Sequence, residues 1–195
     1  VARLVDRALR PLFPEDFHAE VYVTVNLISA DKENMPDALA GLAASAAIAV
    51  SDIPFNGPIS TTQVGLVDGE FVFNPTQAQK EVSDLTLTVA SSKEKVVMIE
   101  AGANEVPEAQ MIDAIFAAHE VNQTVIAFIE TIVAECGKEK HEYASCAIPE
   151  EMFAAMKEIV TPAEMEVAVF TDEKQVREEN IRVIREKLEE AFAEK

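Results

Sequence analysis

Three arginines near the start of the chain have the type and spacing to bind phosphate. Arg3, Arg7 and Arg10 lie four and three positions apart, and residues with this spacing share one face of a helix. The planar guanidinium group presents several N–H donors that match phosphate oxygens. These side chains are therefore candidates for contact with a nucleic acid. The alternative is a solvated helix face whose arginines pair with nearby carboxylates, a common arrangement that contributes little stability.

The rest of the chain is strongly acidic. It has 195 residues and a formal net charge of −19. Most of such a surface would repel RNA or DNA, so binding requires a local concentration of positive charge. The first fourteen residues are such a place, because they hold three arginines and one aspartate.

Other residue types that are typical of active sites are few. His119 falls on the apolar stripe of a predicted helix without a Ser, Cys or acid partner in a recognisable motif, which favours a hydrogen-bonded core histidine. The alternative is an unrelated acidic α/β enzyme that uses His119 or His141 as a general base. Cys136 and Cys146 belong to no CxxC or Cys/His cluster. They indicate neither a disulfide framework nor a zinc site, and we expect a reducing cytoplasm.

The hydrophobic pattern predicts a globular α/β domain with an appendage. Residues 20–28 alternate as a half-buried strand, and the alanine-dense residues 36–50 predict a helix that packs closely on a sheet. Residues 63–73 predict a hairpin around Asp68-Gly69. Two further strands are expected at 85–89 and 96–100.

A long helix is expected from Pro107 to about Gly137, where glycine is a plausible C-cap. Residues 138–145 are polar and aperiodic, and charged helical sequence follows, which indicates a domain boundary. The last helix is expected to begin at Thr171 as N-cap. It reaches Lys195 without a cap, so we expect the second unit to be incomplete. The apolar stripe of this last helix consists of Val176, Ile181, Ile184, Leu188 and Phe192. The longest apolar stretch falls short of the ~20 residues that cross a bilayer, so no membrane partner is expected.

Three motifs resemble bacterial polynucleotide phosphorylases. They are the run from Arg3 to Pro14, the sequence Ile-Pro-Phe-Asn-Gly-Pro at 53–58, and Phe-Asn-Pro-Thr at 73–76. Ala8 departs from the family, which usually has proline there. The resemblance implies an RNase PH-like (ribosomal protein S5 domain 2-like) mixed sheet with packed helices. Residues 1–146 would be the first RNase PH-like domain without its initial strands, and 147–195 the start of an all-helical linker domain.

The resemblance also implies a reaction for the parent enzyme. Such enzymes degrade RNA from its 3′ end by phosphorolysis with inorganic phosphate and Mg²⁺, and they release nucleoside diphosphates. They form homotrimeric rings around an RNA channel in the cytoplasm, and partners in an RNA-degradation complex are expected. The family carries its phosphate and metal sites in the second RNase PH-like repeat.

This first repeat lacks the residues that such chemistry needs. The phosphate loop of the active repeat is rich in serine, whereas the corresponding loop here is Asn34-Met35-Pro36-Asp37. The paired metal-binding aspartates fall on Asn74 and Lys80, and an ammonium group opposes a magnesium ion. We therefore expect no catalytic residue, no bound metal and no activity in this chain alone. Arg3, Arg7 and Arg10 remain as candidate RNA-binding residues, and the alternative is a purely structural or oligomerisation module without RNA contact.

Overall fold

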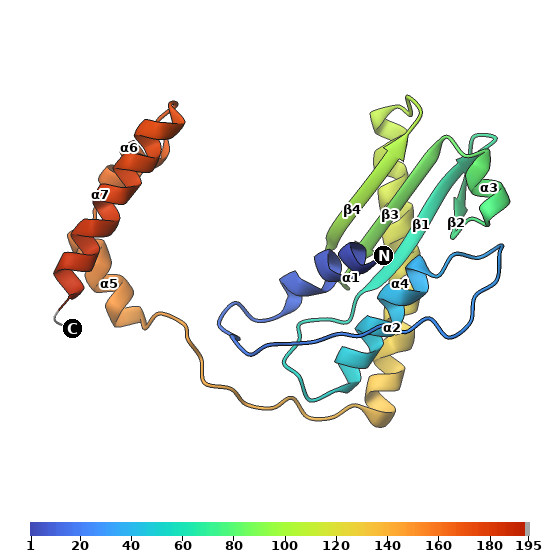
Figure 1. Cartoon of the computed structure of the whole chain (residues 1–195), viewed down its shortest axis with the longest axis horizontal. Helices are drawn as coiled ribbons and strands as arrows, with labels where there is room; N and C mark the ends of the chain where they lie inside the picture. The colour runs from blue at the N-terminus through green and yellow to red at the C-terminus, as the bar shows by residue number, and fades with distance from the viewer. Residues whose placement is uncertain (194–195) are drawn as a thin grey trace. The chain divides into compact units, whose positions relative to one another are not determined.

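The fold was analysed in a computed structural model, which describes residues 1–193 (Figure 1). The chain divides into two units, Val1–Ser145 and Cys146–Lys195. The expected uncapped end at Lys195 lies outside the described residues. None of the helices in the described part is both long and apolar enough to cross a membrane.

A four-stranded antiparallel sheet is the centre of the first unit. Its strands are β1 (Ser60–Val67), β2 (Glu70–Phe73), β3 (Leu85–Ser91) and β4 (Val96–Ala103), in the order β2-β1-β3-β4. This confirms the predicted hairpin, both later strands and the α/β fold class. All three pairings are antiparallel. The mixed pairing that the resemblance implies is thus not present among the described strands.

The β1–β2 turn forms where the sequence predicts it. Asp68 and Gly69 both have positive φ, 53° and 83°, which is the conformation of a two-residue type I′ turn. Aspartate and glycine tolerate this region better than most residues. Local chemistry alone therefore fixes this hairpin.

Two long helices cover the sheet. The helix α2 (Asp37–Val50) brings Gly41 against Thr61, so closely that a Cβ on Gly41 would lie 2.6 Å from Thr61 Oγ1. The helix α4 (Glu108–Cys136) places Asn122 against Thr62. Because successive strand residues point to opposite faces, α2 and α4 approach β1 from opposite sides. Both predicted helices are confirmed, with Pro107 and Gly137 flanking α4.

A buried polar network joins α4 to the sheet. Asn122 is fully buried. Its Oδ1 accepts from Thr62 Oγ1 at 2.8 Å, and its Nδ2 donates to Val89 O and Ser91 Oγ, both at 3.1 Å. All polar atoms of the amide that face the sheet thus have partners, which offsets the cost of burying them.

The expected strand at 20–28 is wrong. These residues have no regular structure, and Tyr22 and Ile28 are 84% and 97% exposed. Alternating sequence forms a strand only when another strand supplies hydrogen-bond partners, and none of the described strands pairs with this segment.

The second unit contains three helices, α5 (Glu150–Ile159), α6 (Pro162–Val169) and α7 (Lys174–Phe192). The N-cap predicted at Thr171 is wrong, because Glu173 holds that position and the Thr171 hydroxyl donates to Val167 O instead. A hydroxyl that bonds the preceding helix is not available to cap the next one.

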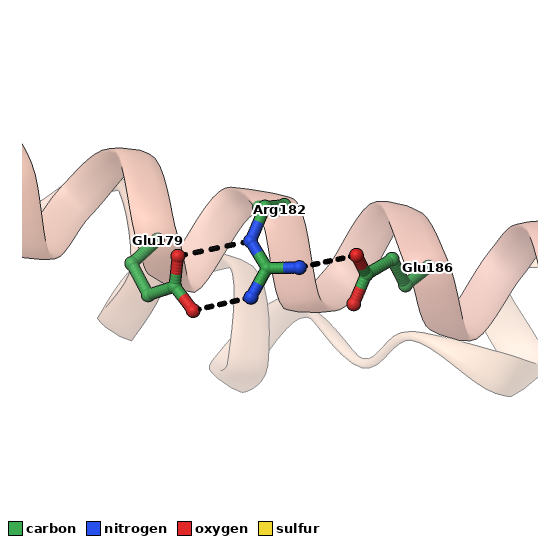
Figure 2. A network of polar contacts seen from close by, with 3 residues as sticks. All are labelled: Glu179, Arg182 and Glu186. Atoms are coloured by element: carbon green, nitrogen blue, oxygen red, sulfur yellow. Dashed lines mark hydrogen bonds and ion pairs between the residues drawn. The ribbon is translucent and has the colours of Figure 1, made fainter.

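Ion pairs join charged side chains on the exposed surface of α7. Figure 2 shows Arg182 between Glu179, one turn before it, and Glu186, one turn after it. These two carboxylates raise the pKa of Arg182 further. The alternating charges of this helix are thus paired along its exposed face, while Ile184, Leu188 and Phe192 of the predicted stripe are half-buried.

Candidate functional site

The arginines lie on an amphipathic first helix, α1 (Ala2–Leu9), and on the 3₁₀ turn η1 (Arg10–Leu12) that follows it. Ala8 and Leu9 are buried in a core cluster that includes Ala44 and Ile48 of α2. Burial of this apolar face fixes the helix on the domain and leaves its opposite face to the arginines.

Two of the three arginines have carboxylate partners. Arg7 Nη1 lies 2.7 Å from Glu100 Oε2 on β4, and Arg7 Nη2 donates to Ile99 O at 3.4 Å. Arg10 pairs with Asp6, one turn earlier, at 3.2 Å. Both ion pairs are solvent-exposed, so each contributes little stability and can be exchanged for another anion.

Arg3 differs from the other two arginines. Its side chain is exposed, and within residues 1–193 it takes part in no ion pair. A guanidinium without a carboxylate partner keeps all its donors for a ligand or for water. Arg3 is thus the residue of this face most available to a phosphate.

In the loop that precedes α2, the side chain of Asp31 accepts hydrogen bonds from other groups of the same loop. Asp31 Oδ1 accepts from the backbone N–H groups of Asn34 (2.6 Å) and Glu33 (2.7 Å), and the Asn34 amide adds to them. These hydrogen bonds, those from Asn34 first, lower the pKa of Asp31. The loop donors that could cradle an anion are therefore used by a carboxylate of the chain.

Asp37 occupies the first turn of α2. A helix N-terminus favours negative charge, and here the charge comes from the protein itself. Asp37 Oδ2 accepts a hydrogen bond from Gln63 Nε2 on β1 at 3.4 Å. An incoming phosphate would meet this carboxylate rather than open N–H donors.

Asn74, the first of the two positions matched to metal ligands, continues the ladder between β1 and β2. Its backbone N–H donates to Gln63 O at 2.7 Å, and its Oδ1 accepts from Gln63 N–H at 3.1 Å. The side-chain oxygen that would face a metal is thus directed to the backbone of β1.

Lys80, the second matched position, lies in the last turn of the short helix α3 (Gln77–Glu81). A capping box of Thr76 and Gln79 fixes the start of this helix. Gln77 N–H also donates to Glu33 O at 2.8 Å. The structure therefore brings the segments 33–37 and 74–80 together.

Sequence reasoning missed Gln63, which joins these two segments. The signal that could have indicated it is a long polar side chain within a predicted strand. In the structure Gln63 is half-buried, and its neighbours Thr61, Thr62, Val64 and Gly65 are buried. The described residues contain no group of three or more His, Cys, Asp or Glu side chains placed to hold a metal ion.

The two candidate histidines lie apart from this region. Gln123 Nε2 lies 3.3 Å from the ring of His119, and within residues 1–193 Gln123 is its only side-chain partner. The predicted hydrogen bond of His119 is confirmed, although the residue is half-buried rather than fully in the core. The ring of His141 is tilted by 54° against that of Phe17, with 5.9 Å between the ring centroids. Among the residues that the structure describes, neither ring is hydrogen-bonded to a nucleophile or an acid that would make it a general base.

Comparison with known proteins identifies relatives along nearly the whole chain. The model of the 3′ exoribonuclease family, domain 1, matches residues 1–54, and that of domain 2 matches residues 57–121. Together they cover more than half of the chain.

Individual relatives are similar over a longer stretch. A polyribonucleotide nucleotidyltransferase of Lachnoclostridium phytofermentans is 65% identical across 99% of this chain and 28% of that protein. One of Syntrophomonas wolfei is 46% identical across 92% of this chain and 26% of its own length. The chain thus spans little more than a quarter of the curated relatives it matches. The crystal structure of rice Rrp46 matches 54% of this chain and 51% of its own, with 14% identity and a TM-score of 0.48.

Proposed function

Because this chain belongs to the 3′ exoribonuclease family, we propose that it is a non-catalytic part of a polyribonucleotide nucleotidyltransferase. Residues 1–146 are the latter part of its first RNase PH-like domain, and 147–195 begin its helical linker domain. The parent enzyme degrades RNA from the 3′ end by phosphorolysis and releases nucleoside diphosphates. It acts as a cytoplasmic homotrimer, with inorganic phosphate and Mg²⁺ held by its second repeat and with partners in an RNA-degradation complex.

The observation that carries the non-catalytic role is the contact of Gln63 with both Asp37 and Asn74. Asp37 repels a phosphate at the start of α2, and Asn74 directs its oxygen to the β1 backbone. Lys80 adds a positive charge where a metal needs a carboxylate. The residues present do not fit a magnesium ion or a phosphate, so no step of the reaction is assigned to this chain.

The role we assign to the arginine face is to guide RNA toward active sites elsewhere in the parent enzyme. Arg3 is exposed and has no ion pair within residues 1–193, and the exposed pairs of Arg7 and Arg10 can yield to RNA phosphates at small cost. The chain as a whole carries a net charge of −19, which disfavours RNA on most of the remaining surface.

Photo-crosslinking of single-stranded RNA to the full-length enzyme tests the role in RNA guidance. We expect crosslinked peptides that contain residues 1–10. Crosslinks that spare these residues while they label other parts of the enzyme would contradict RNA guidance.

That outcome would favour a second function, which is purely structural support and oligomerisation. The observation behind it is the Arg7–Glu100 ion pair, which ties α1 to β4 within the domain. In that case replacement of Arg7 by alanine would alter the oligomeric state of the parent, measured by mass photometry, and leave RNA affinity unchanged.

A further inference from the structure

The segment that leaves α4 is held against the first unit although it contains no helix or strand. We call residues 138–145 the strap. Near its start, Lys138 N–H donates to Val50 O at 3.0 Å, and His141 N–H donates to Asp52 O at 2.8 Å. The strap thus begins alongside the C-terminal end of α2.

The side chain of Lys140 binds the first part of the strap to the C-terminal end of α2. Its Nζ donates to the carbonyl oxygens of Ile48 (3.0 Å), Ala49 (3.0 Å) and Ser51 (2.7 Å). The last carbonyls of a helix lack intrahelical partners and favour a nearby cation. All three donors of the ammonium group are used here, so Lys140 caps α2 and anchors the strap in one arrangement.

Asp16 fastens the other end. Its carboxylate accepts hydrogen bonds from the hydroxyl groups of Tyr143, at 2.7 Å, and Ser145. These bonds, that from Ser145 first, lower the pKa of Asp16. The neighbouring Phe17 ring lies edge-on to Tyr143 at 5.1 Å. The strap is therefore clasped at two ends by groups from two different parts of the first unit.

We propose that the contacts of the strap with the first unit, at Lys140 and at Asp16, set the length of the chain that connects the two units. We call these contacts the clasp. The Ser145–Asp16 contact is the last of the strap, and α5 begins at Glu150. With the clasp closed, the connecting chain is residues 146–149, which span at most about 14 Å when fully extended. With the Asp16 end open and the contacts of Lys138, Lys140 and His141 kept, it is residues 142–149, which span up to about 28 Å. Contacts at Asp16 and Lys140 thereby control the reach of the helical unit.

Hydrogen exchange of the full-length protein tests whether the clasp exists. Replacement of Asp16 by alanine removes the acceptor of both hydroxyls, and Tyr143→Phe removes one donor. We expect the strap amides to exchange about tenfold faster in Asp16→Ala, the order expected when hydrogen bonds to a charged group are lost. The matched control is Tyr22→Phe, because Tyr22 also donates to a carboxylate, that of Glu20, at 2.8 Å. Unchanged exchange in Asp16→Ala, or an equal increase in Tyr22→Phe, would overturn the clasp.

A distance measurement tests its consequence. Spin labels are placed on Cys136, which is exposed at the end of α4, and on α7 through Glu190→Cys, in full-length protein without other cysteines. We expect Asp16→Ala to broaden the distance distribution and Tyr22→Phe to leave it as in the parent. Faster strap exchange with an unaltered distribution would overturn the control of reach.

Discussion

The side-chain amide of Gln63 donates a hydrogen bond to the carboxylate of Asp37 across 3.4 Å, which joins β1 to the first turn of α2. The backbone N–H of the same residue donates to Asn74 Oδ1 at 3.1 Å. The two segments matched to a phosphate loop and a metal site therefore meet at one strand residue. Asp37 and Asn74 thus both accept hydrogen bonds from Gln63, so this arrangement ties two segments of the fold together.

Replacement of Asp37 by asparagine tests whether this arrangement is catalytic. Asparagine keeps an oxygen that can accept from Gln63 but removes the charge. We expect kcat for phosphorolysis by the full-length enzyme to stay within about twofold of the parent. Lys80→Ala serves as a second variant with the same expected result. A fall in kcat of about a hundredfold or more would indicate acid–base or nucleophilic chemistry at Asp37.

The buried amide of Asn122 should matter far more for stability than its neighbour does. Asn122→Leu leaves Thr62, Val89 and Ser91 without their partner, and we expect a loss of about 2–4 kcal/mol. The matched control is Gln123→Leu, which removes a half-buried contact to Ser92 O and should cost less than about 1.5 kcal/mol. Hydrogen exchange of the β3 amides measures both values. Equal losses in the two variants would be inconsistent with this network.

Local signals in the sequence predicted much of the fold. The Asp68-Gly69 turn has its own chemistry, and the long apolar periodicity of α4 indicates a helix in any context. Residues 20–28 were predicted wrongly because a strand depends on a partner that their own alternation does not show. The N-cap at Thr171 was predicted wrongly because its hydroxyl bonds the preceding helix.

The candidate site was predictable only in part. The types of Asp37, Asn74 and Lys80 indicated lost chemistry, and spacing alone placed the arginines on one face. The contacts of Gln63 and Lys140 were not predictable, because each joins segments that are distant in sequence. The pairing of Arg7 with Glu100 is of the same kind.

The carboxyl group of Glu164 should titrate unusually low. A hydrogen bond from Lys187, at 2.7 Å, and the capping contacts of Thr161 lower its pKa from 4.5 to about 2. Because the folded pKa is depressed, these contacts stabilise the helical unit fully above pH 4.5, and their contribution is lost as the pH falls toward 2. NMR titration of the carboxyl carbon measures the midpoint. In Lys187→Gln the midpoint should rise toward 4.5, and a midpoint that stays near 2 would contradict the pairing.

Arg3 should contribute more to RNA affinity than Arg10. Arg10 already pairs with Asp6, so binding of RNA must first displace that carboxylate, whereas Arg3 has no such competitor among the described residues. We expect Arg3→Ala to weaken binding of single-stranded RNA more than Arg10→Ala does, as measured by fluorescence anisotropy with the full-length enzyme. The reverse order would show that exposure does not govern the contribution of each arginine.

The most direct test of RNA guidance is the salt dependence of RNA affinity in the full-length enzyme with Arg3, Arg7 and Arg10 all replaced by alanine. Each lost phosphate contact should flatten the plot of log K against log salt by about 0.7, so three contacts predict a change of about 2 together with weaker binding. The control replaces three exposed cations elsewhere, Lys93, Lys95 and Arg185, with the same change in net charge. The account predicts a flatter slope in the arginine variant alone. An affinity and slope equal to those of the parent enzyme, or an equal change in the control, would contradict it.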